Sequence, residues 1–504
     1  MSDIALTTVE GSGTLSNPYV VNSTADFIFL SKNVMQDKHI VINCDITLNE
    51  EVFDEYGNIS GGDGAVYSWA TNDYKGAYID GRGHTISGMY ISNIDSVRNG
   101  LFHNSVVAEI KNWTASNFYI YSGDYAGVFG VRTLVLKNVK TKKCYIHGTR
   151  FMGGLVYRAE NVEECESGTY LFNGSQATGG IMGVCVDSSI INTKFYGKID
   201  CLEKKTAVGI GGIIGNCSGK VRIKNCENYA YVFGGTNGTG GIIGASTMPE
   251  YEVQIENCTN YGDVVTDTSG NNAGIMGRIE GSLVIINCAN YGKVYTKQKT
   301  SDFEGSVLVG RVMVYNGRCT KVVIKNCKGV DYFGNPIVFK TESPFSAEEM
   351  IIVIDNVDVK YKCKKLAQRL IIWSNSATCA ITKISNINLE IEADSCVFNL
   401  ISWYRQKNTV ELKNIYIHIK TKNYKGFGLL STNLVIDFVC EGVLLDVDNN
   451  GKIVKNYYGS DFSGYYCDWK TGNLGLKAMS GKGFFQQSVT EEMIVNKGFT
   501  KKEA

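Results

Sequence analysis

The sequence predicts an all-β protein whose chain forms a right-handed single-stranded parallel β-helix, a solenoid of about 12 coils. Three observations lead to this prediction: a glycine motif that recurs about once per coil, an alternating apolar strand that ends in Asn-Cys, and very few prolines. The 504 residues include 56 glycines and only 4 prolines. That balance is typical of many tight turns and many hydrogen-bonded strands, because proline removes a backbone donor.

The first repeat is a glycine followed by two apolar residues and, in most copies, by a second glycine. Its copies begin 26 to 33 residues apart, at Gly100, Gly127, Gly154, Gly180, Gly212, Gly241 and Gly274. Three short strands with their turns fill about this length, so each interval predicts one coil. One coil cannot bury its own inward face, and the coils must therefore stack on one another.

The second repeat is an alternating strand that ends in Asn-Cys, at residues 225–226, 257–258, 287–288 and 326–327. We expect equivalent residues to lie one strand spacing apart, so that the asparagine amides hydrogen-bond along the stack and occupy left-handed turns. The cysteines then act as small apolar core residues. A metal or redox site built from these columns is the alternative, but the chain has no Cys-x-x-Cys pair, and we predict neither a metal nor a cofactor.

A third element places tyrosines at equivalent turns, as Asn-Tyr-Gly in two coils and Asn-Tyr-Ala in another. We expect Tyr229, Tyr261 and Tyr291 to line up along one edge of the rod. These three are the candidate binding residues, because aromatic faces stack on sugars and the hydroxyls provide polar contacts. The alternative, which we favour, is a stacked ladder that only covers the core.

The chain divides into four predicted segments: a lead-in with a cap (1–38), glycine-rich β-helix repeats (39–335), a continuation of the β-helix (336–450), and a separate C-terminal module (451–504). Ser23 to Asp26 resembles a capping box, which predicts a short helix over residues 23–35 on the N-terminal end. The C-terminal module is rich in aromatic residues: Tyr457, Tyr458, Tyr465, Tyr466, Trp469, Phe484 and Phe485. It caps the rod, drives oligomerisation or serves as an attachment device.

Composition excludes several classes of protein. The 50 basic and 50 acidic side chains cancel, which argues against a nucleic-acid binder, since such a protein needs a basic surface. The sequence contains no run of eighteen apolar residues, so no membrane-spanning segment is predicted. The N-terminus carries no signal-peptide pattern. We therefore expect the 16 cysteines to be mostly free thiols of a protein assembled in a reducing cytoplasm.

Catalysis is not predicted. Asp80 and His84, with Asp63 and Asp73 nearby, have the chemistry for acid–base work. However, Asp80 belongs to an Asp-Gly turn and His84 begins the next strand, so a structural role fits better. No catalytic triad and no nucleotide-binding loop is present. A polysaccharide lyase or depolymerase is the enzyme alternative, and it requires at least two carboxylates on facing coils.

One stretch carries a family resemblance. Trp69 and the run from Tyr74 to Gly88, which contains Asp-Gly-Arg-Gly-His-Thr-Ile-Ser, resemble the opening of GLUG-motif proteins with pectin-lyase-like β-helices. With the glycine repeats, the resemblance covers about residues 11–330. It implies a right-handed β-helix and surface adhesion. The chain differs from the family in residues 70–72, Ala-Thr-Asn, where Pro-Ile-Gly is usual, and in lacking the signal peptide of the secreted bacterial relatives.

These features together favour a non-enzymatic structural or adhesion protein of a phage virion: a tail spike, tail fibre or head fibre. Such a protein assembles in the host cytoplasm without a signal peptide and tolerates free cysteines. We expect a homotrimer that contacts other virion proteins or a host-surface polysaccharide, with no nucleic acid partner. A bacterial surface adhesin, located on the cell surface, is the alternative.

Overall fold

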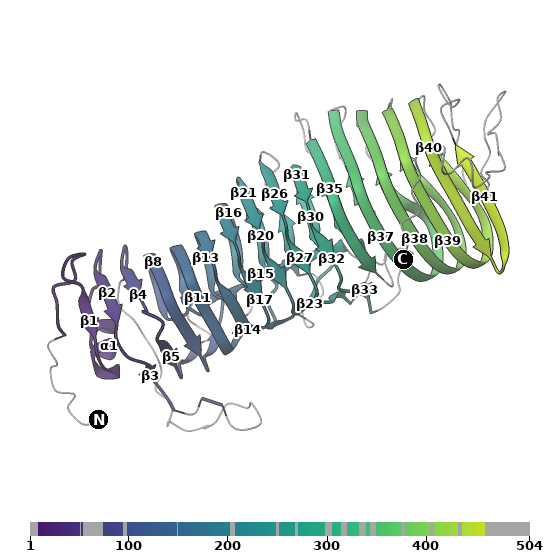
Figure 1. Ribbon diagram of the computed structural model, residues 1–504. Coiled ribbons are helices and arrows are strands. Elements are labelled where there is room, and N and C mark those ends of the chain that lie inside the picture. Colours follow the sequence, from purple (N-terminus) through teal and green to yellow (C-terminus); the bar gives the residue numbers. More distant parts are fainter. Residues whose placement is uncertain are drawn as a thin grey trace.

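The computed structural model describes residues 9–50, 52–53, 74–93, 98–148, 150–201, 207–247, 251–267, 271–297, 305–313, 320–331, 339–342, 349–374, 379–403, 408–431 and 436–458. The chain winds into a rod in which the strands of successive coils lie side by side and parallel (Figure 1). The predicted right-handed parallel β-helix is confirmed. The weaker repeats after residue 340 also belong to it, as strands that pair in parallel as far as residue 449.

Each coil has three faces. A left-handed residue separates the first face from the second, and a glycine turn separates the third face from the first face of the coil that follows. The first face precedes the left-handed residue and contains β2 (His39–Ile42), β4 (Tyr78–Asp80), β13 (Val156–Glu163), β16 (Met182–Ile191), β20 (Ile214–Ser218), β21 (Val221–Lys224), β25 (Ile243–Ser246), β26 (Glu252–Glu256), β30 (Met276–Glu280), β31 (Ser282–Ile286), β34 (Val309–Met313) and β36 (Phe339–Glu342). The second face follows that residue and contains β3 (Ile46–Thr47), β5 (Thr85–Ser87), β6 (Tyr90–Asn93), β9 (Tyr119–Ser122), β14 (Glu166–Phe172), β17 (Lys194–Phe195), β18 (Lys198–Asp200), β22 (Glu227–Asn228), β23 (Tyr231–Gly234), β27 (Thr259–Asn260), β28 (Val264–Thr266), β32 (Ala289–Asn290) and β33 (Val294–Thr296).

The third face is a separate parallel sheet of short strands: β7 (Arg98–Asn99), β10 (Tyr125–Gly127), β12 (Phe151–Gly153), β15 (Gln176–Gly179), β19 (Val208–Gly211), β24 (Asn237–Gly240) and β29 (Asn272–Ala273). Longer strands bend around from one face to the next: β8 (Phe102–Ser116), β11 (Gly130–Gly148), β35 (Thr320–Asp331), β37 (Glu349–Ser374), β38 (Cys379–Trp403), β39 (Asn408–Ser431) and β40 (Ile436–Asn449). The long strands dominate the C-terminal half of the rod (Figure 1).

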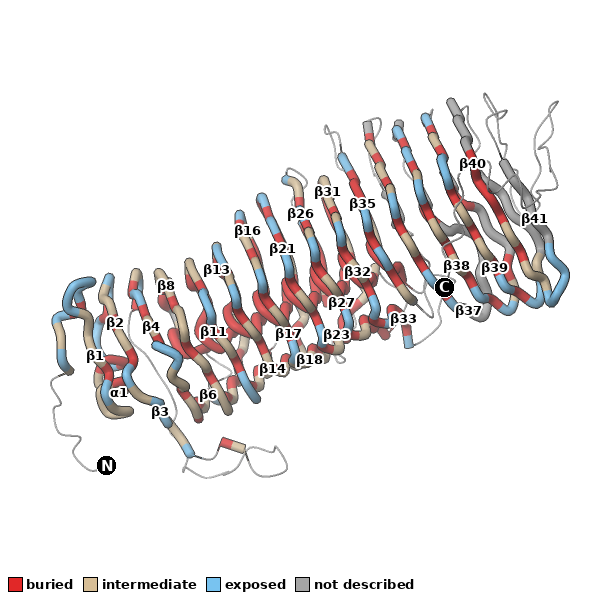
Figure 2. The backbone as a smooth tube through the Cα atoms, viewed as in Figure 1, coloured by how far each residue is buried: buried red, intermediate tan, exposed pale blue. Residues whose placement is uncertain are grey.

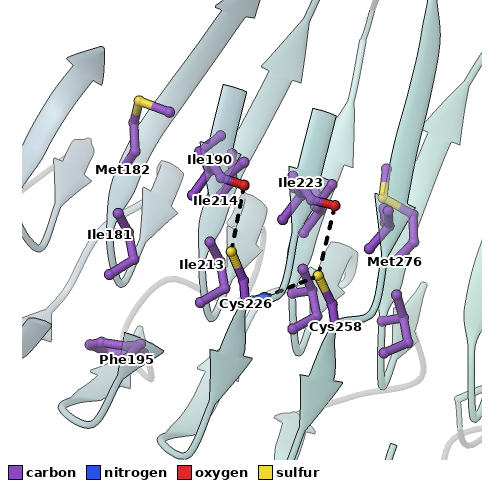
Figure 3. Packing of buried hydrophobic residues seen from close by; sticks show 14 of the residues in the cluster. Ile181, Met182, Ile190, Phe195, Ile213, Ile214, Ile223, Cys226, Cys258 and Met276 are labelled. Carbon is purple, nitrogen blue, oxygen red and sulfur yellow. Dashed lines mark hydrogen bonds between the residues drawn. The ribbon is translucent and has the colours of Figure 1, made fainter. Parts of the chain in front are cut away.

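The core runs without interruption through the inside of the coils (Figure 2). Alternation along each strand produces it: in β21, Val221 and Ile223 are buried while Arg222 is exposed. Equivalent side chains of neighbouring coils then pack in columns, as Ile213, Ile214 and Met276 do with their neighbours in Figure 3. Period-two alternation therefore assigns one side of each strand to the core.

The N-terminal end is covered by the helix α1 (Thr24–Ser31), which follows β1 (Tyr19–Val21). Ser23 is its N-cap and accepts a hydrogen bond from the Asp26 backbone N–H at 3.1 Å, as the capping box predicts. The Phe27 ring packs edge-on against Trp113 in the core, 5.8 Å between centroids. The helix ends earlier than the predicted span of 23–35, where the Asn33 side chain donates to the Phe29 carbonyl oxygen of the last turn.

The other end of the parallel stack is closed by a hairpin. The strand β41 (Lys452–Tyr458), which the sequence assigned to the C-terminal module, pairs antiparallel with β40. Asn450 and Gly451 form the turn, with φ of 52° and 86°, the left-handed pair of a type I′ hairpin. This antiparallel strand interrupts the parallel repeat at residues 443–449. The other aromatic residues of that module lie outside the described residues.

Candidate functional site

The outer asparagine ladder occupies the turn between the first and second faces. Asn225, Asn257, Asn287 and Asn326 all have φ between 53° and 55°, the left-handed region. Each side-chain amide donates to the side-chain oxygen of the preceding asparagine, at 3.0 Å for the last three. The prediction of hydrogen-bonded asparagines in left-handed turns is therefore confirmed, and their polar groups are used in joining coils.

The cysteines that follow these asparagines point into the core. Cys226 and Cys258 are fully buried, and Figure 3 shows their sulfurs directed at the Ile190 and Ile223 carbonyl oxygens of the preceding coil. Burial raises the pKa of Cys258 well above its usual value, and that of Cys165 to about 12. Such thiols stay protonated near neutral pH and are poor nucleophiles and poor metal ligands. These cysteines fill the core, as expected.

A second, inner asparagine column was missed by sequence reasoning. Asn228, Asn260 and Asn290 are completely buried inside the second face. The amide of Asn228 donates to Asn260 Oδ1 and that of Asn260 to Asn290 Oδ1, both at 2.7 Å. Asn260 also donates to the Gly262 carbonyl oxygen at 2.8 Å. The signal in the sequence was the recurrence of asparagine before tyrosine in the Asn-Tyr motif, which we interpreted through the tyrosine alone.

The glycine repeat explains how the inner column fits. In the last three copies of the motif the first glycine lies directly over an inner asparagine, so that a Cβ added at Gly241 would lie 2.3 Å from Asn260 Cγ. A Cβ at Gly274 would lie 2.2 Å from Asn290 Cγ. No side chain fits there without moving its neighbours. The glycine motif and the Asn-Tyr motif are therefore the two halves of one packing arrangement.

The tyrosine ladder consists of Tyr196, Tyr229, Tyr261 and Tyr291 on the outside of the same turns. Neighbouring ring centroids lie 4.9, 4.8 and 5.6 Å apart, with interplanar angles of 12°, 10° and 20°. Between 41% and 49% of each residue is exposed. The structure thus brings the three candidate tyrosines together, and it adds Tyr196, which occupies the same turn one coil earlier.

Ring orientation decides what this ladder offers to a ligand. Tyr229 and Tyr261 each lie nearly parallel to the ring on either side, so neighbouring rings cover both of their faces. A sugar cannot stack on those faces while the ladder is intact, but ring edges and hydroxyl groups remain available. Sugar binding by these residues stays a prediction, with polar contacts in place of face-to-face stacking.

One tyrosine of the ladder, Tyr229, is held by an ion pair that joins two coils. The Tyr229 hydroxyl donates to Glu227 at 2.9 Å, and Lys194 Nζ lies 2.7 Å from the same carboxylate. The hydrogen bond to Glu227 raises the pKa of Tyr229, and the contact with Lys194 lowers the pKa of Glu227. Lys194 and Glu227 are register partners, so this contact also aligns adjacent strands.

The residues considered for acid–base catalysis are engaged in turns. Asp80 accepts hydrogen bonds from the Arg82 backbone N–H and the Asn112 amide, at 2.9 and 3.0 Å. His84 lies 3.3 Å from Asp45 on the neighbouring coil. Both arrangements fit the structural role expected from the sequence. Asp63 and Asp73 lie outside the described residues.

The described residues contain neither a candidate metal centre nor a membrane-spanning helix. Within them, no three His, Cys, Asp or Glu side chains gather in a way that could hold a metal ion. No helix in the described part of the chain is long and apolar enough to cross a membrane.

Comparison with known proteins adds little beyond the fold. No protein-family model and no curated protein sequence matches the chain. Among solved structures, it is similar to a Bacteroides ovatus protein described as a "putative immunoglobulin A1 protease". The two are 18% identical, and the match covers 62% of this chain and 79% of that chain with a TM-score of 0.26. A likeness this distant carries no argument about activity.

Proposed function

We propose that the chain is a non-enzymatic adhesion rod, a phage virion component such as a tail spike, tail fibre or head fibre. It binds a host-surface glycan or another virion protein. The observation that carries the proposal is the tyrosine ladder, a regular row of exposed phenol groups. The asparagine and cysteine columns, by contrast, are used in holding the coils together.

A row of this kind suits binding to a repeating surface. The coils hold the hydroxyls at a fixed spacing, so little conformational entropy is lost when a ligand binds. Several weak polar contacts in a row then add up on one extended ligand. The resemblance to GLUG-motif proteins, for which surface adhesion is common, supports the same function. A homotrimer would multiply the effect by presenting three ladders.

The proposal is tested on the full chain with a glycan array and with intact particles. We expect Tyr229→Ser combined with Tyr261→Ser to weaken glycan or particle binding about tenfold or more. Tyr251→Ser is the matched control, because Tyr251 is similarly exposed (42%) but does not belong to the ladder. Binding that is equal in the double variant and the control would contradict a role for the ladder.

The virion assignment has its own tests. Light scattering after size exclusion should give three times the 55.3 kDa of the chain, and a monomer at micromolar concentration would contradict the trimer. Fractionation of the native source should place the protein in particles. Recovery on a bacterial envelope would replace the virion assignment with the bacterial adhesin.

A further inference from the structure

Along one edge of the rod, called the corner below, side chains of the third face contact side chains of the first face in the coil that follows. Tyr157 of β13 lies against Tyr125 of β10 and Phe151 of β12, with ring centroids 4.8 and 5.7 Å away. Further along, Arg278 of β30 donates to Asn237 of β24 at 2.7 Å. These contacts align aromatic and charged side chains along the corner.

Charged register partners on adjacent coils usually have opposite signs. This holds for Lys137 with Glu163, Lys140 with Glu166, Lys194 with Glu227, Lys224 with Glu256, Lys360 with Glu390, Lys362 with Glu392 and Lys383 with Glu411, all within 2.7 to 3.2 Å. Opposite charges at facing positions stabilise the stack, and like charges destabilise it. Where two lysines do face each other, at Lys111 and Lys137, each has an acidic partner of its own.

Arg132 and Arg158 depart from this rule inside the corner. They are direct register partners, and both carry a positive charge. Arg132 lies 3.5 Å from Glu160, whereas Arg158 has no ion-pair partner among the residues that the structure describes. The Nε atoms of both are buried and, within the same residues, have no hydrogen-bond acceptor. Two unsatisfied guanidinium N–H groups thus lie side by side.

A second pair of register-partner arginines lies further along the same corner. Arg278 and Arg311 are also register partners. There, however, Arg278 forms a close ion pair with Glu280, whose side chain is only 10% exposed. The chain itself supplies the carboxylate at that position. The carboxylate two residues from Arg158 is Glu160, but it lies 3.5 Å from Arg132, so Arg158 is left for a carboxylate from a ligand.

Two more arginines and the aromatic rings border the Arg132–Arg158 pair. Arg98 lies over Tyr125 and Arg150 lies over Phe151, at 6.0 and 4.9 Å from the ring centroids. Asp124 offsets Arg150 at 3.4 Å. With four arginines and the two acids Asp124 and Glu160, the cluster has a net charge of 4 − 2 = +2 on a chain whose total charge is zero.

We propose that this arginine–aromatic corner, made of Arg132, Arg158, Tyr125, Phe151 and Tyr157, binds a carboxylate-bearing polysaccharide lying along the rod. Each sugar carboxylate accepts N–H groups from the terminal Nη atoms of a guanidinium and so relieves the repulsion between the two arginines. The Tyr157 hydroxyl, whose pKa burial raises to about 12, stays protonated and donates to a sugar oxygen. The site deepens the proposed function by naming a ligand class, but it lies away from the tyrosine ladder.

A nucleic acid fits this corner less well. Bases bind by stacking on free aromatic faces, but Tyr125 and Phe151 stack on each other at 6°, and an arginine lies near each ring. A net charge of +2 is also low for a strand with a phosphate on every nucleotide. A polysaccharide with widely spaced carboxylates matches the low charge and the need for hydrogen-bond acceptors.

The test uses the full chain in calorimetric titrations with three carboxylated polysaccharides: hyaluronan, polysialic acid and alginate. The methyl esters of the same polymers are the uncharged controls, and a single-stranded oligonucleotide is the competing class. We expect at least one polymer to bind and its methyl ester to bind about tenfold more weakly or worse. Arg158→Gln should remove this preference, and Arg158→Lys should retain part of it. Arg222→Gln, an exposed arginine on another part of the rod that pairs with Glu256, is the matched control and should bind normally.

A second measurement does not depend on the choice of polymer. Without ligand, Arg158→Gln should unfold at the same temperature as the natural protein or higher, because a like-charge contact is removed. A lower unfolding temperature would show that Arg158 stabilises the fold, and would overturn the proposal. So would equal binding of all three polymers and their esters, unchanged binding by Arg158→Gln, or tighter binding of the oligonucleotide. The Tyr229→Ser, Tyr261→Ser variant should bind the polymer normally, so failure at either site is seen separately.

Discussion

The glycine-rich coils between residues 207 and 297 and the long-strand coils between residues 349 and 449 share an outer turn but differ inside. The outer ladder continues into the second region, where Asn356 donates to Asn326 at 2.9 Å and Asn414 to Asn386 at 3.2 Å. The inner column does not continue as asparagine. After Asn290, the register partners in that column are Gly329, Val359, Leu389, Ile417 and Leu445.

This difference shows that one backbone course accepts two kinds of interior. An amide column needs hydrogen-bond partners along the stack and glycines opposite it, because a buried amide without partners is costly. An aliphatic column needs only shape complementarity, and it lets the strands continue as long uninterrupted elements. The outer turn is common to both regions because it requires only a left-handed residue that hydrogen-bonds along the stack. The course of the backbone sets this requirement, whatever side chains fill the interior.

The largest expected effect is at the inner column of the glycine-rich region. Asn260→Ala removes the donor to Gly262 and the contacts with Asn228 and Asn290, leaving several buried polar atoms without partners. We expect the free energy of unfolding to fall by about 3 kcal/mol or more. In the aliphatic region, Leu389→Ala should cost a similar amount, about 2–5 kcal/mol, through cavity formation instead. Urea denaturation measures both.

Serine substitutions distinguish the two causes of lost stability, unpaired polar atoms at Asn260 and a cavity at Leu389. Asn260→Ser restores a small polar group and should recover part of the loss, whereas Leu389→Ser should be worse than Leu389→Ala, because it buries a hydroxyl among aliphatic side chains. If serine had the same effect at both positions, the proposed difference between the two interiors would be contradicted.

The outer ladder should respond equally in both regions. Asn257→Ala and Asn386→Ala each place alanine at φ near 54° and remove a ladder hydrogen bond: the one that Asn257 donates to Asn225 and the one that Asn386 accepts from Asn414. We expect each to lower the free energy of unfolding by about 1–3 kcal/mol. The matched variants Asn257→Gly and Asn386→Gly adopt this φ without strain and should lose less. A large difference between the two positions in denaturation experiments would show that the turn is not equivalent in the two regions.

Ion pairs on the outside should matter less. Glu390→Gln breaks the pair with Lys360, and Glu256→Gln breaks those with Arg222 and Lys224. These side chains are 32% to 62% exposed, so we expect losses below about 1 kcal/mol in either region. Raising the salt concentration to about 1 M should remove the difference from the natural protein by screening. A loss that persists at high salt would mean that these carboxylates do more than pair with cations.

The smallest effect concerns pH at the C-terminal end of the long-strand region. His418 lies 3.3 Å from Asp446 on the next coil, and this hydrogen bond raises the pKa of His418, with Glu390 and Asp448 adding to it and burial opposing it. A raised pKa in the folded state means that the contact stabilises fully below about pH 6.5 and is lost as pH rises through the folded-state value.

The natural protein should therefore exceed His418→Gln in stability at pH 5.5 and match it at pH 8.5. Denaturation midpoints at the two pH values, or hydrogen exchange of β40 and β41, measure the difference. A gap that widened at high pH would show that neutral His418 is the stabilising form.

Much of the fold could be predicted from the sequence because its causes are local. The period of about 30 residues marks one coil, alternation assigns the inward side of each strand, and asparagine is among the few residues that adopt a left-handed φ easily. The N-cap at Ser23 was predicted for the same reason. The Asn450–Gly451 hairpin was also available in the sequence, as a standard Asn-Gly turn between alternating apolar residues, but it was missed.

What the tertiary structure alone decided depends on contacts between residues about 30 positions apart. The register of the stacked coils places Gly241 over Asn260 and Arg132 opposite Arg158. The same register covers the ring faces of Tyr229 and Tyr261. A shift of one residue would turn each side chain to the other side of its strand. The sequence by itself determined that the chain coils and which turns repeat. The stacking determined which groups are used within the rod and which remain for a ligand.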